Sequence, residues 1–213
     1  MSPTAKSITA RPPQLFMSHP WDTDELQRST HERTRMLATQ LEEIGWSTWF
    51  DEDQMVGNID AAMVAGIDDA DAIIVCLTAK YCEKVSSAAA DLRQRDNCLN
   101  EWTYANNRKK VLVPVIMEPS MRNPSDWPPG VVTMHFGSTL YVDASSSTDM
   151  KDVAHKLSAM LNRLNINRRV VQFKRPSPAT HRSPPPLTLR GDARSTSTVL
   201  QLFRQKQSIV AIQ

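Results

Sequence analysis

The sequence predicts an α/β domain in which five parallel strands form a sheet flanked by helices. Apolar segments of strand length alternate along the chain with segments that carry helical periodicity. This alternation is typical of βαβ units, whose parallel strands are joined by right-handed crossovers. Residues 72–77 (AIIVCL) form a continuous apolar run, which is typical of a strand covered on both faces of a sheet.

The first expected helix lies between two strands. The first strand is expected at residues 14–18, and the helix follows from residue 24. Gly45 is typical of a C-terminal cap and should end that helix. The second strand is expected at residues 46–50, and it leads into a polar loop at residues 51–58. The apolar stripe of the helix consists of Leu37, Leu41 and Ile44.

The middle of the chain continues the alternation on both sides of the 72–77 strand. A helix precedes this strand, and a short helix around residues 80–84 follows it. Small and charged residues at 86–96 indicate a loop insertion, after which a helix is expected at residues 98–107. The preceding helix should place three apolar residues on one face, namely Ile59, Met63 and Ile67.

The last part of the domain should supply two strands and a closing helix. Residues 111–117 read as a buried strand, and four prolines at 119–129 then indicate a long irregular connection. The last strand is expected at residues 139–142, and the folded part should end near residue 166. The closing helix carries an apolar stripe of Val153, Leu157, Leu161 and Leu164.

Three parts are expected along the chain: a disordered leader at residues 1–13, one domain at residues 14–166, and a tail at residues 167–213. A targeting role is the alternative for the leader. The tail is rich in proline, serine and arginine, so it is expected to be disordered and basic. Its apolar end at residues 199–212 is the exception, and we expect that end to dock on a partner or to form a small helix.

Composition argues against several classes of protein. No apolar run approaches the roughly 18 residues of a membrane-spanning helix, so no span is expected. The cysteine usage indicates a reducing compartment, and the predicted location is cytoplasmic. The three cysteines lack CxxC spacing and the five histidines lie far apart, so neither a disulfide framework nor a metal site is inferred. Nucleic-acid binding by the tail is the weaker hypothesis, because only Phe173 and Phe203 accompany its basic residues.

Three segments resemble motifs of the TIR domain family, named for Toll and interleukin-1 receptors and resistance proteins. Residues 15–19 (LFMSH) are similar to the family's opening box, and residues 45–59 are similar to its second strand and BB loop. Residues 97–101 (NCLNE) resemble its W-C-L-x-E segment, and residues 113–115 (VPV) resemble the strand that follows. The resemblance covers about residues 15–166 and implies a flavodoxin-like TIR fold.

The resemblance implies that Glu101 is the catalytic residue of an NAD⁺ glycohydrolase. Such an enzyme would cleave the nicotinamide–ribose bond to give nicotinamide and ADP-ribose or cyclic ADP-ribose, with NAD⁺ as substrate and no cofactor. Cleavage builds positive charge on the ribose, which a fixed carboxylate stabilises. The alternative is a glutamate that the helix dipole and solvation alone favour in a first helical turn. Trp102 is expected to be a core residue rather than a ring platform.

The resemblance also implies a nucleotide pocket at the carboxyl end of the first strand. Ser18 is a candidate for hydrogen bonding and Trp21 for stacking, although Trp21 could equally be a packing residue in a loop. Ligands of open α/β sheets bind beyond the carboxyl ends of the strands, which agrees with this placement. The candidate substrate-binding residues are Ser18, His19, Trp21, Asp22 and Asp51.

The polar loop at residues 51–58 resembles the BB loop, through which TIR domains contact one another. Its candidate assembly residues are Gln54, Met55, Val56 and Gly57. The resemblance thus implies self-association and binding to other TIR domains, whereas the plain alternative is an acidic, solvated turn. A rival function follows from the same loop, namely a non-catalytic adaptor that acts only through contacts between TIR domains.

Overall fold

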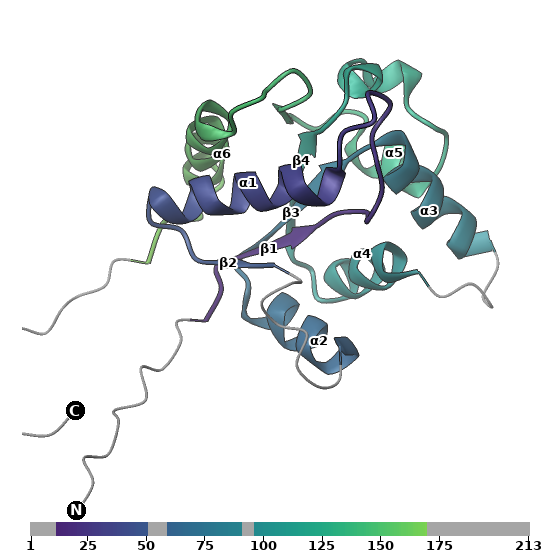
Figure 1. Cartoon of the computed structure of the whole chain (residues 1–213). Helices are drawn as coiled ribbons and strands as arrows, with labels where there is room; N and C mark the ends of the chain where they lie inside the picture. The colour runs from purple at the N-terminus through teal and green to yellow at the C-terminus, as the bar shows by residue number, and fades with distance from the viewer. Residues whose placement is uncertain (1–11, 51–58, 91–95, 170–213) are drawn as a thin grey trace, which may run out of the picture. The chain divides into compact units, whose positions relative to one another are not determined.

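The computed structural model describes residues 12–50, 59–90 and 96–169 of the chain (Figure 1). Within these ranges, five parallel strands form one sheet in the order β2-β1-β3-β4-β5. This is the doubly wound order of flavodoxin-like folds, so the predicted fold class is confirmed. The strands are β1 (Leu15–Ser18), β2 (Thr48–Trp49), β3 (Ala72–Leu77), β4 (Val111–Ile116) and β5 (Val142–Asp143).

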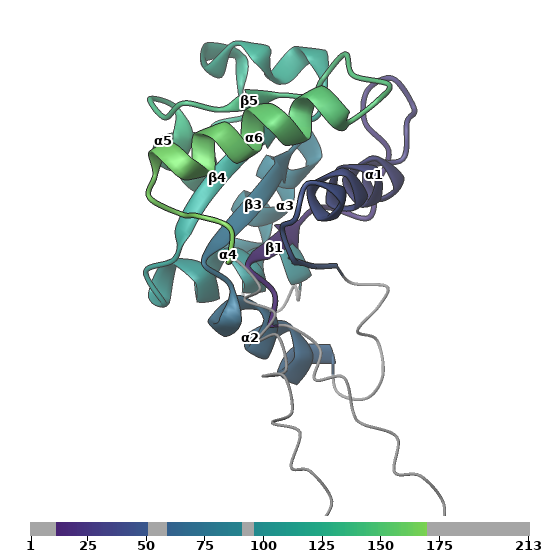
Figure 2. The ribbon, with the colours of Figure 1, turned by 90° about the vertical axis from the view of Figure 1, so that its left-hand side faces the viewer.

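Helices cover both faces of the sheet, and each face has its own core (Figures 1 and 2). One face is covered by α1 (Thr30–Glu43) and α6 (Lys151–Arg163). The other is covered by α2 (Ile59–Asp69), α3 (Ala79–Ala90), α4 (Asn97–Asn107) and α5 (Val131–Phe136). Successive strand residues point to opposite faces, so Ile74 packs against α1 and α6 while Ile73 and Val75 pack against the other helices.

Helix α1 begins later than the sequence indicated. Its N-cap is Ser29, whose side chain accepts a hydrogen bond from the Glu32 amide at 3.2 Å. The preceding turn is held by Asp24, whose Oδ1 accepts from the amides of Leu26 and Arg28, both at 2.9 Å. The predicted end of the helix is confirmed, because Gly45 adopts a φ of 95° and its amide bonds to Glu42.

The loop insertion expected at residues 86–96 is wrong in its first half. Residues 86–90 continue α3, because the alanine-rich segment favours a helix more than its small side chains suggested. The irregular connection at 119–129 contains short 3₁₀ turns, η2 (Pro119–Arg122) and η3 (Pro124–Asp126). Helix α5 was not predicted, since its valines and threonine resemble a strand; Val132 and Phe136, one turn apart, bury its inner face.

Several predicted strand and helix positions need correction. Strand β2 is shorter than residues 46–50, and β5 lies beyond most of residues 139–142. Leu140 is 77% exposed, so its apolar character did not mark a buried strand. The apolar stripes of α2 and α6 are also narrower than expected, since Ile59 is 47% exposed and Leu164 is 43% exposed, while the other predicted members of both stripes are buried.

Gly66 sets how closely α2 approaches the edge of the sheet. A Cβ atom at this position would lie 2.7 Å from both Cδ1 and Nε1 of the Trp49 indole. That indole stacks in turn on Phe16 of β1, with ring centroids 4.3 Å apart. The absence of a side chain at residue 66 therefore lets a helix, an indole and a central strand pack in one layer.

Some predictions fall on residues that the structure does not describe. Most of the predicted leader and tail, at residues 1–11 and 170–213, lies outside the described residues. The same holds for residues 51–58, which include Asp51, Gln54, Met55, Val56 and Gly57. In the part of the chain that is described, no helix has both the length and the apolar character to cross a membrane.

Candidate functional site

Glu101 and Ser18 form a buried hydrogen bond at the carboxyl end of β1. The Ser18 hydroxyl donates to Oε2 of Glu101 over 2.6 Å, and Glu101 is only 5% exposed. Helix α4 brings Glu101 there because Asp96 caps its start, accepting from the amides of Cys98 and Leu99. The structure thus brings together a predicted catalytic residue and a predicted binding residue that lie on a helix and a strand far apart in sequence.

Tyr81 completes a chain of hydrogen bonds behind this pair. Its hydroxyl lies 3.0 Å from Ser18 Oγ, and its side chain is fully buried. Burial raises the pKa of Tyr81 well above its usual range, and the neighbouring Cys98 and Glu101 add to the effect. Tyr81 therefore stays a neutral phenol. Because Ser18 gives its one proton to Glu101, the Tyr81 hydroxyl must donate to Ser18.

Next to Ser18, His19 forms a pair with a second histidine. Nε2 of His19 lies 2.8 Å from Nδ1 of His31 in the first turn of α1, and both side chains are buried. Nδ1 of His19 lies 3.0 Å from the Met17 carbonyl oxygen, which can only accept, so this nitrogen carries a proton. In neutral His19 the Nε2 atom is then the acceptor, and His31 donates to it.

Aromatic rings extend this pair toward solvent. Trp21 stacks on His31 with ring centroids 3.9 Å apart, and it is 51% exposed. On the inner side, Phe50 stacks on His19 at 5.1 Å with an interplanar angle of 12°. Trp21 lies beyond the carboxyl end of β1, and its ring centroid is 6.3 Å from that of His19. Trp21 packs on His31 and keeps about half of its surface exposed, so its two sequence interpretations, a packing residue and a residue that stacks on a ligand, are compatible.

Asp22 forms ion pairs with two lysines at this edge. Its carboxylate forms an ion pair with Lys84 of α3 at 2.8 Å and lies 3.9 Å from Nζ of Lys80. These lysines are partly exposed. Asp22 therefore holds the ammonium groups of Lys80 and Lys84 close to Trp21, at the solvent-facing rim of the site.

Cys98 closes the inner side of the site. Its thiol lies 3.7 Å from the His19 carbonyl oxygen and is buried at the start of α4. Burial raises the pKa of this thiol far above its usual range, and the carboxylates of Glu101 and Asp96 raise it further. The group is therefore a neutral donor and not a nucleophilic thiolate.

A buried ionic cluster fixes the loop between β1 and α1, which carries His19, Trp21 and Asp22. Asp24 Oδ2 accepts from Arg28 Nε at 2.7 Å and from Arg33 Nη1 at 3.2 Å. Arg33 also donates to the carbonyl oxygens of Met117 and Ala144, beyond β4 and β5. Burial alone would raise the pKa of Asp24, but the hydrogen bonds and charge of Arg28 outweigh it and lower that pKa below its ordinary value.

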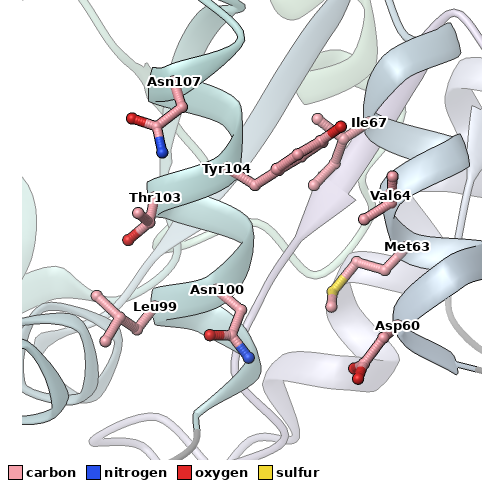
Figure 3. Close-up of a pocket in the computed structure, with 9 residues that line it drawn as sticks. All are labelled: Asp60, Met63, Val64, Ile67, Leu99, Asn100, Thr103, Tyr104 and Asn107. Carbon is pink, nitrogen blue, oxygen red and sulfur yellow. The ribbon is translucent and has the colours of Figure 1, made fainter. Parts of the chain in front are cut away.

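A separate groove of about 540 Å³ lies between α2 and α4 (Figure 3). Met63, Val64 and Ile67 line it from α2, and polar side chains such as Thr103 and Tyr104 line it from α4. None of the predicted site residues with described coordinates lines this groove. Although Asn100 lines it, the next residue, Glu101, turns toward β1, so the groove is distinct from the Ser18–Glu101 pair.

The predicted site residues did not include His31 and Tyr81, which the structure places beside His19 and Ser18. His31 lies twelve positions after His19, so sequence spacing gave no sign of their contact. Tyr81 lies in the short helix expected around residues 80–84, and that expectation gave no sign of its contact with Ser18. Among the described residues, no group of three or more His, Cys, Asp or Glu side chains could hold a metal ion. Trp102 is buried against Phe136, which confirms its prediction as a core residue.

Comparison with models of known protein families gave a match. The chain matches the family model described as "TIR domain" over residues 16–159, which is more than half of its length. The matched segment includes every described residue of the site, from Ser18 to Glu101. A comparison with curated proteins gave no match.

Proposed function

Because this chain belongs to the TIR domain family of signalling proteins, we propose that it is an NAD⁺ glycohydrolase with Glu101 as its catalytic residue. The observation that carries the proposal is the buried hydrogen bond between Ser18 and Glu101. It lies at the edge of the sheet where open α/β folds bind ligands. The expected reaction releases nicotinamide and yields ADP-ribose or its cyclic form.

Burial of Glu101 argues against the solvated alternative. A glutamate that merely favoured a helix start would extend into water, whereas this one is 5% exposed and accepts from a buried hydroxyl. Glutamate is almost never buried unless it is paired, because desolvation of a carboxylate is costly. Costly buried titratable groups at strand ends are candidates for function, which supports the catalytic interpretation.

The proposed chemistry needs one well-placed carboxylate. The bond between ribose C1′ and the nicotinamide nitrogen breaks, and both bonding electrons go to the nicotinamide ring, which leaves as a neutral molecule. Glu101 would stabilise the positive charge that develops on the ribose or hold its hydroxyl groups. Water then adds to C1′ and loses a proton, which gives ADP-ribose. In the cyclic product, an adenine nitrogen takes the place of water.

The residues around Glu101 have complementary proposed roles. Ser18 orients the carboxylate, and Tyr81 fixes the Ser18 hydroxyl from behind. Trp21 is backed by His31 and half-exposed, so it could stack on a planar ring of the substrate. Lys80 and Lys84 could attract the pyrophosphate, because their partly exposed ammonium groups lie at the same rim.

A second candidate is a TIR adaptor without catalysis. TIR domains generally bind one another, and two apolar side chains on the described surface are unusually exposed: Met134 at 82% and Leu140 at 77%. Both functions would use self-association, and residues 54–57 stay the predicted assembly loop. Replacing Gly57 with proline fixes φ and removes an amide donor, so it should weaken assembly and activity together.

The deciding experiment incubates the purified protein with NAD⁺ over a series of protein concentrations and measures nicotinamide by chromatography. An assembling enzyme should show a specific activity that rises with protein concentration, and Gly57→Pro should lower it while the protein stays folded. No nicotinamide at any concentration would refute the enzymatic proposal and leave the adaptor. Activity that is independent of concentration and unchanged in Gly57→Pro would refute the part played by assembly.

A further inference from the structure

A second buried glutamate, Glu118, lies directly beyond β4 and its neighbour Met117. It is only 3% exposed, and both of its oxygens accept hydrogen bonds from backbone amides. Oε1 accepts from Ala79 over 2.6 Å, and Oε2 accepts from Glu25 over 2.8 Å. Those amides belong to the segments that follow β3 and β1, so one side chain ties three adjacent strand ends together.

The first of these bonds controls the start of α3. Ala79 is the first residue of that helix, and the Thr78 hydroxyl accepts from the Tyr81 amide at 3.1 Å in the same turn. Glu118 therefore supplies, from another strand, an acceptor for an amide that has no partner within its own helix. The turn that is fixed in this way carries Tyr81, whose hydroxyl contacts Ser18.

The second bond holds the loop between β1 and α1. Glu25 donates its amide to Glu118 and accepts the amide of Ser120 with its own Oε1 at 2.8 Å, so the two segments bind each other reciprocally. The same loop begins with Trp21 and Asp22, the rim residues of the site. The start of α3 and the β1–α1 loop, which both lie next to Ser18, are thus anchored on the segment that starts at Glu118.

We propose that Glu118 is a positioning residue of the site, which holds Tyr81 and the β1–α1 loop so that Ser18 presents its hydroxyl to Glu101. This inference rests on the proposed NAD⁺ cleavage. Glu118 acts through backbone amides and through Tyr81, and not on the substrate. A carboxylate suits this position because both of its oxygens accept. Glutamine would keep one acceptor and turn an NH₂ group toward the other amide.

The test compares Glu118→Gln and Glu118→Ala with the parent and with Ser158→Ala. The last variant is a matched control, because it removes a buried hydrogen bond from Trp46 Nε1 at 3.1 Å on the opposite face of the sheet. Two measurements need no activity: amide hydrogen exchange of Ala79 and Glu25, and the NMR signals of the Tyr81 ring. A third measurement gives kcat and KM for nicotinamide release.

In both Glu118 variants we expect exchange at one or both amides to accelerate by about tenfold or more, because charge-assisted hydrogen bonds are lost. The Tyr81 ring signals should shift, and kcat should fall by about tenfold with little change in KM, less in the glutamine variant than in the alanine variant. Ser158→Ala should show none of these changes. Glu118→Gln keeps the test valid if the alanine variant does not fold.

The outcomes separate this inference from the proposed function. Unchanged exchange and unchanged Tyr81 signals in both variants would overturn the anchoring by Glu118. Altered signals with an unchanged kcat would overturn its positioning role. If the parent releases no nicotinamide, the proposed function fails, whereas amide exchange and the Tyr81 signals still decide whether Glu118 anchors the start of α3 that carries Tyr81.

Discussion

Replacing Glu101 with glutamine isolates the negative charge of the proposed catalytic group. The amide has nearly the shape of the carboxylate, and its oxygen can still accept from Ser18, which lies 2.6 Å from Oε2 in the parent. The bond changes from charge-assisted to neutral, which should cost about 1 kcal/mol of stability. Removing a preorganised charge that stabilises a transition state should slow the reaction by about 10² to 10³.

Alanine at position 101 should destabilise the protein more than glutamine does. It removes the acceptor of the hydroxyl of Ser18, a residue that is 1% exposed, which costs about 1 to 3 kcal/mol. It also removes buried methylene groups at about 0.8 kcal/mol each. The alanine variant should therefore melt several degrees below the glutamine variant, since a domain of this size loses about 2 to 4 °C per kcal/mol. Both variants should release nicotinamide at least about 10² times more slowly than the parent.

The assays are nicotinamide release and thermal denaturation, with Glu43→Gln as the matched control. Glu43 is an exposed glutamate at the end of α1, so its neutralisation should change neither rate nor melting temperature. Parental activity in Glu101→Gln would show that the charge is not used. Parental activity in both Glu101 variants, beside an active parent, would remove Glu101 from the mechanism altogether.

Three further predictions concern the fold. Gly66→Ala should destabilise the protein by about 1 to 3 kcal/mol in thermal denaturation, because its Cβ would lie 2.7 Å from the Trp49 indole; an unchanged melting temperature would contradict this packing. Since the folded pKa of Asp24 is lowered, its ion pairs should stabilise the fold above about pH 4 and be lost as the pH falls through that folded pKa. Asp24→Asn should therefore reduce the acid-side decline in melting temperature, and an identical decline would refute the assignment. A chain ending at Arg169 should melt close to the full chain, because it keeps the Arg169–Asp71 ion pair at 2.6 Å; a large drop would show that the tail stabilises the domain.

The central strands could be predicted from sequence because their chemistry is local. Residues 72–77 are a continuous apolar run, and β3 spans those same residues with every side chain buried. Edge strands carry less information. Strand β5 pairs with β4 at only two register positions, and these follow the exposed Leu140. Short pairing of this kind depends on where the neighbouring strand ends, which the local sequence does not state.

The site could be predicted only in part, for a related reason. The position of Ser18 follows from the end of β1, and that of Glu101 from the family-like start of α4. The burial of Glu101 depends on the rotation of α4 against β1, which is a tertiary property. The contact between His19 and His31 likewise depends on the turn held by Asp24, which folds α1 back over the strand end.

The two buried glutamates beyond the strand ends, Glu101 and Glu118, differ in the kind of donor that each accepts from. Both oxygens of Glu118 are held by backbone amides, which cannot turn away without moving a loop or a helix start. One donor to Glu101 is a side-chain hydroxyl, and the Ser18 O–H can rotate about a single bond toward a substrate oxygen. The geometry therefore suits Glu118 to a fixed structural contact and Glu101 to a contact that is exchanged when a sugar hydroxyl arrives. This difference in donor type is why the two residues receive different proposed roles, although both are buried glutamates beside the same strands.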